Sequence, residues 1–192
     1  MTAKLEKLTD LGIFLPTTKL PTMRIFLVGY MGCGKSTVGR QLAKLLNYEH
    51  LDLDVLFETE YKITIADFFK KYDEIAFRKI EHQLLLSTFN LKNYVISTGG
   101  GTPCFFNNMD LINQNGISVY IRMHPKSLFF RLLNSKRTRP LTSGLDEVSL
   151  LKSIEEKLAG REKFYNQAQI IVKGEDIDVV ALSRVLKSHD PI

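Results

Sequence analysis

The chain has 192 residues, of which 44% are hydrophobic and 24% are charged, a composition typical of a folded globular protein rather than a disordered or fibrous one. Its net charge of +5 is compatible with nucleic-acid binding, but the basic residues are spread along the chain. The densest basic cluster (Lys136, Arg137 and Arg139) suits an anionic small molecule at least as well, so we expect no nucleic-acid partner. No apolar stretch is long enough to span a bilayer, and the two cysteines give neither a disulfide framework nor metal-ligand spacing. We therefore expect no membrane partner, reduced thiols and a cytoplasmic location.

Residues 1–22 differ in character from the rest of the chain. They contain two prolines, mixed charges and only short apolar pieces, so they lack the continuous apolar core of a signal peptide. Met23 stands directly before the first predicted strand. We interpret residues 1–22 as an N-terminal extension of unknown role and residues 23–192 as one α/β domain.

Short apolar runs alternate with amphipathic segments after residue 22, which favours a parallel sheet covered by helices on both faces. The predicted strands are Met23–Val28, His50–Leu53, Tyr94–Ser97, Ile117–Ile121 and Ile170–Val172. One predicted helix spans Lys35–Leu46, with Val38, Leu42 and Leu45 on its inner side, and another spans about Asp73–Phe89, with Phe77, Ile80 and Leu84 inside. Pro103 and Pro125 mark two further helix starts. Residues 134–148 are polar and basic and predict an exposed, mobile segment between two helices.

The run from Gly29 to Ser36 reads G-x-x-x-x-G-K-S between a predicted strand and a predicted helix. This is the phosphate-binding loop of nucleotide triphosphatases in the context that such a loop requires. Its glycines let consecutive backbone N–H groups face an anion, Lys35 supplies a cation for the β- and γ-phosphates, and the Ser36 hydroxyl can bind Mg²⁺. We assign nucleotide binding to Gly32, Cys33, Gly34, Lys35, Ser36 and Thr37.

Asp52 and Asp54 lie two residues apart at the end of the second predicted strand, so we expect both carboxylates on one side. The carboxyl ends of parallel strands are where ligands bind in open α/β sheets, and two like charges there favour a bound cation or substrate hydroxyls. The alternative is that Asp54 is a helix N-cap and Asp52 is solvated.

Three further features depart from simple packing. Arg161 falls on an apolar helical stripe formed by Leu151, Ile154, Leu158 and Tyr165, where it must find an anion or extend from the edge of that face to solvent. Arg78 and Glu81 are spaced i and i+3 and can pair, either beside an apolar face or as a surface ion pair. Gly99, Gly100 and Gly101 follow a strand, either as a close approach to a ligand or as a flexible turn.

Taken in order, these residues resemble the shikimate kinases from Met23 to about Val172. The resemblance rests on the phosphate loop through Arg40, Asp52-Leu-Asp54, Ile65–Phe69, Phe77–Glu81, Ser97–Gly101, Arg139-Pro-Leu141, and Arg161 before a tyrosine. It implies a three-layer fold with a five-stranded parallel sheet of order 2-3-1-4-5 and a mobile lid at about residues 134–148. It also implies that the protein is a monomer that transfers the γ-phosphate of MgATP to the 3-hydroxyl of shikimate in aromatic amino-acid biosynthesis.

The same resemblance implies roles for single residues. Asp54 would hold the substrate hydroxyls and act as general base, Asp52 would hold Mg²⁺ with Ser36, and Lys35 and Arg139 would stabilise the phosphoryl group in transfer. Arg131 and Arg139 would also contact the nucleotide. The implied shikimate contacts are Asp54, Phe69, Phe77, Arg78, Gly99, Gly100, Gly101 and Arg161.

Two other functions remain open at this point. Another small-molecule kinase of this fold, such as gluconate kinase, would also use two arginines for a carboxylate, although the Asp-x-Asp and triple-glycine context favours shikimate. A nucleotide-dependent switch or nucleic-acid module is supported by basic charge alone, and the Asn-Lys-x-Asp motif of GTPases is absent from the sequence.

Overall fold

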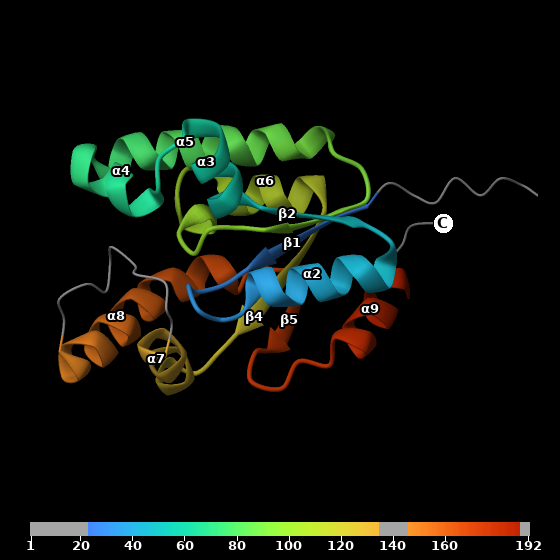
Figure 1. The fold of residues 1–192 in the computed structure, drawn as a ribbon. Coiled ribbons are helices and arrows are strands. Elements are labelled where there is room, and N and C mark those ends of the chain that lie inside the picture. Colours follow the sequence, from blue (N-terminus) through green and yellow to red (C-terminus); the bar gives the residue numbers. More distant parts are fainter. Residues whose placement is uncertain (1–22, 135–145, 189–192) are drawn as a thin grey trace, which may run out of the picture.

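The computed structural model describes residues 23–134 and 146–188, and at their centre lies a five-stranded parallel sheet (Figure 1). Its strands are β1 (Arg24–Val28), β2 (Glu49–Asp52), β3 (Tyr94–Ser97), β4 (Ile117–Arg122) and β5 (Ile170–Lys173). They are ordered β2-β3-β1-β4-β5, and every neighbouring pair is parallel. The predicted topology and strand positions are confirmed to within two residues at each end.

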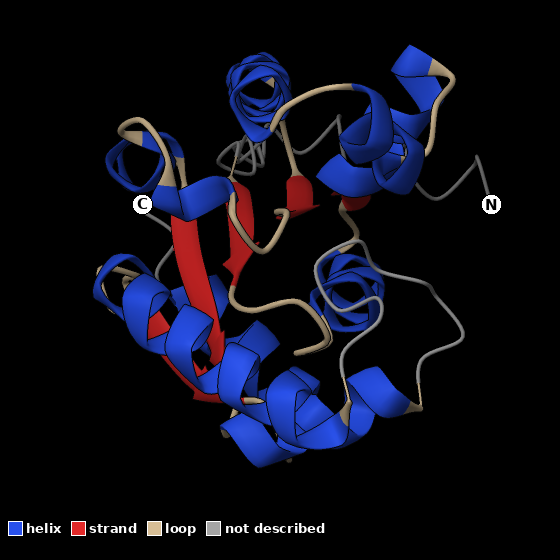
Figure 2. Cartoon of the chain, turned by 90° about the vertical axis from the view of Figure 1, so that its left-hand side faces the viewer, coloured by secondary structure: helices blue, strands red, loops and turns tan. Residues whose placement is uncertain are grey.

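Helices lie on both faces of this sheet (Figure 2). The helices are α2 (Lys35–Leu46), α3 (Leu53–Tyr61), α4 (Ile65–Lys71), α5 (Glu74–Ser87), α6 (Asn108–Asn115), α7 (Pro125–Leu133), α8 (Glu147–Tyr165) and α9 (Val179–Ser188). Helices α3, α4 and α5 contact one another on one side of the molecule, and α7 contacts α8 on another (Figure 1). Pro125 begins α7 as predicted, whereas Pro103 lies only in a short 3₁₀ segment, η3 (Thr102–Cys104).

Helix α2 has the predicted bounds, but its buried face differs from the predicted one. Val38 and Leu42 are buried, whereas Leu45 is 42% exposed and Leu46 is buried instead. The cause is close packing at Gly39, where an added Cβ would lie 2.5 Å from His50 Nε2. Because α2 contacts both β3 and α9, its inner face is centred on Gly39 and Ala43, and Leu45 faces outward.

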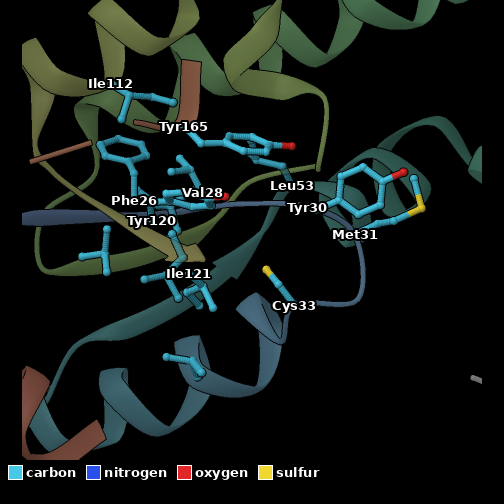
Figure 3. Close-up of a cluster of buried hydrophobic side chains, with 14 of the residues drawn as sticks. Phe26, Val28, Tyr30, Met31, Cys33, Leu53, Ile112, Tyr120, Ile121 and Tyr165 are labelled. Carbon is cyan, nitrogen blue, oxygen red and sulfur yellow. The ribbon is translucent and has the colours of Figure 1, made fainter. Parts of the chain in front are cut away.

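The core lies between the sheet and its covering helices. Figure 3 shows Tyr165 of α8 and Tyr120 of β4 near Phe26, with the sulfur of Cys33 turned from the phosphate loop toward the same cluster. The rings of Tyr120 and Tyr165 have centroids 5.1 Å apart. In α5, Phe77 and Leu84 are buried as predicted, but Ile80 is only partly buried. The core therefore reaches the underside of the phosphate loop and fixes its position.

Two parts of the predicted organisation, residues 1–22 and most of the segment 134–148, lie outside the described residues. The helices α7 and α8 flank that second segment, as expected. Within the described ranges, none of the helices combines the length and the apolar character needed to cross a membrane.

Candidate active site

The phosphate loop, the two aspartates and the glycine run lie at or just after the carboxyl ends of three neighbouring strands. Strand β3 lies between β1 and β2, so the loops that follow these three strands meet at one edge of the sheet. The cleft at this edge is lined by Met31, Gly32, Gly34, Lys35, Ser36, Thr37, Asp52, Asp54, Thr98 and Gly100. The sheet order thus brings together the phosphate loop, the two aspartates and the glycine run.

The phosphate loop has the left-handed backbone that its glycines were expected to provide. Gly29, Gly32 and Gly34 have φ angles of 141°, 83° and 102°, which are strained for residues with a side chain. The Lys35 ammonium is buried and donates to the carbonyls of Gly29 at 2.8 Å and Tyr30 at 3.0 Å. Lys35 is the first residue of α2, and the dipole of this helix also favours an anion at its N-terminus.

Asp52 and Asp54 both line the cleft, but the structural reason differs from the predicted one. β2 ends at Asp52, and Asp54 lies in the first turn of α3 rather than beyond a longer strand. Asp52, not Asp54, is the N-cap residue, and its Oδ1 accepts from the backbone N–H groups of Asp54 at 3.0 Å and Val55 at 3.4 Å. Its Oδ2 accepts a hydrogen bond from the Ser36 hydroxyl. The suggested cap at Asp54 with a solvated Asp52 is therefore wrong.

The oxygen atoms around Ser36 fit a magnesium ion. Mg²⁺ binds hard oxygen ligands and commonly takes only one or two from the protein, with the rest from water and substrate phosphates. The Ser36 hydroxyl and the Asp52 carboxylate lie in contact beside the phosphate loop, which is the required donor chemistry. No cluster of three or more His, Cys, Asp or Glu that could hold a metal occurs in the described part of the chain.

The triple glycine is not a loose turn, because charged side chains pack against it. A Cβ on Gly99 would lie 2.4 Å from Glu81 Oε1 and 3.0 Å from Asp54 Oδ1. A Cβ on Gly101 would lie 2.5 to 2.6 Å from three guanidinium atoms of Arg78. Glycine is needed here because the arginine and the carboxylates approach the backbone itself.

Arg78 and Glu81 form a buried ion pair rather than a surface one. Arg78 Nη1 lies 2.8 Å from Glu81 Oε2, and each side chain is 6% exposed. Arg78 also donates to Glu74 Oε1 at 2.8 and 3.1 Å. Burial lowers the pKa of Arg78, but the two carboxylates outweigh it and raise that pKa above its ordinary value, so Arg78 remains cationic.

Arg161 approaches the glycine run from the opposite helix, α8. Its Nη1 donates to the Gly100 carbonyl at 3.3 Å, and its guanidinium lies 5.4 Å from the centre of the Tyr30 ring. Tyr165 donates to the same carbonyl at 2.5 Å, and burial raises the pKa of Tyr165 well above its ordinary value, so it stays a donor. Arg161 thus finds backbone and aromatic partners next to the cleft rather than leaving the apolar face for solvent.

Two aromatic residues and a third arginine complete the part of the predicted set that the structure describes. The rings of Phe69 and Phe77 have centroids 4.8 Å apart, and Phe77 lies under the Arg78 guanidinium at 5.1 Å. Arg131 of α7 donates to the Cys33 carbonyl at 3.3 Å, which places it beside the phosphate loop. Cys33 itself is buried, and both cysteines are free thiols. Arg139 lies outside the described residues.

Sequence reasoning missed three residues that shape this site. Thr102, which is fully buried, donates from its hydroxyl to Glu81 Oε1 at 2.6 Å. Tyr165 and Tyr30 position Arg161 as described above. A polar residue directly after three glycines was the signal for Thr102. Tyr165 was noted in the apolar stripe and as the tyrosine after Arg161, but no role was predicted for it.

The chain is similar to known shikimate kinases over most of its length. The sequence model of the shikimate kinase family matches residues 31–188. A shikimate kinase of Bacteroides thetaiotaomicron is 40% identical over 156 residues, which cover 81% of this chain and 89% of that protein.

Solved structures agree with the sequence comparisons. A shikimate kinase structure from Bacteroides thetaiotaomicron has a TM-score of 0.81 and 37% identity, and covers 87% of this chain and 97% of that one. The shikimate kinase of Acinetobacter baumannii in complex with shikimate has a TM-score of 0.78 and 32% identity, and covers 88% of this chain and 92% of that one.

Proposed function

The chain belongs to the shikimate kinase family and is an ATP-dependent kinase that phosphorylates shikimate, and we propose how its residues divide the work of transferring the γ-phosphate of MgATP to the 3-hydroxyl. The observation that carries the proposal is the position of Asp54, which lines the same cleft as Lys35 and Ser36 and borders the glycine run. A donor phosphate and an acceptor hydroxyl can therefore meet between these residues.

On the nucleotide side, the loop Gly32–Thr37 binds the phosphates through its N–H groups, and Lys35 leaves its own loop carbonyls to contact the β- and γ-phosphates. Ser36 and Asp52 hold Mg²⁺, which neutralises phosphate charge when bound. Arg131 lies beside Cys33 and contacts the nucleotide. Arg139 is proposed from its place in the family motif as a further cation on the transferring phosphate, in a lid at about residues 134–148.

On the acceptor side, Asp54 binds the substrate hydroxyls and accepts the proton of the attacking one. Arg78 and Arg161 bind the carboxylate, since a planar guanidinium matches a carboxylate better than an ammonium does. Both flank the glycine run, at Gly101 and Gly100. The N–H groups of Gly99–Gly101 and the rings of Phe69 and Phe77 complete the pocket.

Phosphoryl transfer depends on positioning and charge neutralisation more than on covalent chemistry by the protein. Lys35, Arg139 and a bound metal ion would offset the charge on the phosphoryl group, while the two carboxylate-binding arginines would orient the acceptor. We further propose, from the family resemblance, that the protein is a cytoplasmic monomer.

A coupled assay of ADP release tests this proposal with shikimate and gluconate as alternative acceptors. We expect turnover with shikimate and little with gluconate, and Asp54→Asn to lower kcat by about 10²- to 10⁴-fold, the range that a general base contributes. Nucleotide affinity, measured by calorimetry, should change little. A loss of ATP affinity as large as the loss of rate would place Asp54 on the nucleotide side and contradict the assignment.

A further inference from the structure

A chain of buried hydrogen bonds runs from Arg78 away from the cleft. Glu81 uses both carboxylate oxygens within it: Oε2 accepts from Arg78 at 2.8 Å and Oε1 accepts from the Thr102 hydroxyl at 2.6 Å. Glu81 therefore cannot rotate without losing one of these partners. The orientation of Arg78 depends on Thr102 through this carboxylate.

The chain continues from Thr102 to a second pair of side chains. Asn108, which is 1% exposed, donates from Nδ2 to the Thr102 carbonyl at 2.8 Å. Its Oδ1 lies 2.6 Å from His82 Nδ1, and because an amide oxygen only accepts, His82 Nδ1 carries the proton and donates. His82 also packs on Phe106, with ring centroids 4.9 Å apart.

These contacts connect helix α5 at two neighbouring points to the segment that runs from η3 into α6. Glu81 and His82 are consecutive residues of α5, while Thr102 and Asn108 stand at η3 and at the start of α6. Thr102 directly follows the glycine run whose last member, Gly101, packs against the Arg78 guanidinium. The bonds therefore fix the glycine run and Arg78 relative to each other.

We propose that His82, Asn108 and Thr102 are positioning residues that act through Glu81 to hold Arg78 in the orientation that binds the acceptor carboxylate. This inference rests on the proposed function, because it takes Arg78 to be a carboxylate ligand. None of the three is among the residues that line the cleft. Their effect is on the KM for the acid, with the nucleotide side left unchanged.

Thr102 offers a matched pair of variants. Thr102→Val keeps the shape of the side chain but leaves Glu81 Oε1 buried without its donor, whereas Thr102→Ser keeps the hydroxyl. We expect Thr102→Val to raise the KM for shikimate about tenfold with the KM for ATP within twofold of the parent protein, and Thr102→Ser to restore the shikimate KM to within about threefold. Thermal unfolding of each variant reports whether the fold is retained.

A double-mutant cycle with Arg78→Ala separates positioning from general damage. If Thr102 acts through Arg78, Thr102→Val should change the shikimate KM less than twofold once Arg78 is absent. An equal effect in both backgrounds, or an equal rise in the KM for ATP, would overturn the inference. So would an unchanged shikimate KM in folded Thr102→Val.

The single variant Arg78→Ala distinguishes the two proposals. If it leaves the shikimate KM unchanged, the carboxylate role of Arg78 fails and the proposed function must be revised. If it raises that KM while folded Thr102→Val does not, only the positioning chain fails.

Should Thr102→Val not fold, His82→Phe, which removes the donor but keeps an aromatic ring against Phe106, is compared with His82→Gln. We then expect a threefold or greater rise in shikimate KM for His82→Phe alone, and no difference between the two overturns the inference.

Discussion

Gly101→Ala tests whether Arg78 binds the substrate carboxylate, because this substitution moves Arg78 without changing any charged group. Gly101 has φ −96° and ψ −20°, a conformation that alanine adopts freely, so the backbone is not strained. The new Cβ would lie 2.5 to 2.6 Å from three guanidinium atoms of Arg78, a distance that non-bonded carbons do not tolerate. Because the guanidinium is the far end of a flexible side chain, it moves instead of the backbone.

The expected magnitude follows from the contacts that move. A hydrogen bond to a charged group is worth about 1.5 to 3 kcal/mol, and 1.36 kcal/mol corresponds to tenfold. Displacing Arg78 from a carboxylate should therefore raise the shikimate KM by about 10- to 100-fold. The KM for ATP should stay within about twofold, because the phosphate loop does not contact Arg78 in the described structure.

Steady-state kinetics with each substrate varied in turn measures this difference. Gly160→Ala is the matched control: Gly160 lies in α8, nothing lies within 4 Å of its added Cβ, and alanine favours a helix by about 1 kcal/mol over glycine. The control should melt at the same or a higher temperature with both KM values unchanged. An unchanged shikimate KM in folded Gly101→Ala would refute the reasoning, as would a parallel rise in both KM values.

Two further predictions concern stability and thiol chemistry. Arg24→Met removes hydrogen bonds to the carbonyls of Asn115 (2.6 Å), Phe89 (2.6 Å) and Leu91 (2.9 Å). We expect the free energy of unfolding to fall by about 2 kcal/mol, with both KM values unchanged. Equal denaturant midpoints for the parent protein and the variant would contradict this prediction. Burial raises the pKa of Cys104 from 9.0 to about 11. At pH 8 the thiolate fraction of Cys104 should therefore be about 100-fold below that of an exposed thiol, and its rate of alkylation by iodoacetamide should be lower by the same factor. This rate should rise as the pH approaches 11. Peptide mass spectrometry follows that rate, and alkylation in the native protein as fast as in urea would contradict the prediction.

The features that the sequence predicted best are those encoded locally. The phosphate loop is recognisable because glycines, lysine and serine stand in fixed order between an apolar strand and a helix. All of these residues lie within one stretch of eight residues. The strands are short apolar runs because a parallel sheet covered by helices buries both faces of each strand. The sheet order and the shikimate roles of single residues came from the family resemblance, whereas local patterns only marked Asp54, Arg78 and Arg161 as candidate site residues.

The features that the sequence did not predict depend on contacts between distant segments. Leu45 has helical spacing for the buried side, yet the close approach of His50 at Gly39 turns it outward. Asp52 and Asp54 were expected together at the end of one strand, but α3 begins between them because the Asp52 side chain caps the first N–H groups of that helix. The Thr102–Glu81 bond joins residues 21 positions apart, so no pattern within one element could show it.

The peptide at Gly100 lies where the proposed nucleotide side and the proposed acid side of the site meet. Its carbonyl accepts from both Tyr165 and Arg161, and a Cβ on Gly100 would lie 3.0 Å from the Met31 backbone nitrogen of the phosphate loop and 3.7 Å from Arg161 Nη1. One segment of backbone therefore contacts both the phosphate loop and Arg161, the arginine that we propose as a ligand of the acid. Because β3 lies beside β1 in the sheet, this spacing is set by strand pairing and not by flexible side chains. Phosphoryl transfer requires the attacking and leaving oxygens roughly in line, and under the proposed roles a spacing fixed by the sheet would favour that alignment before either substrate binds.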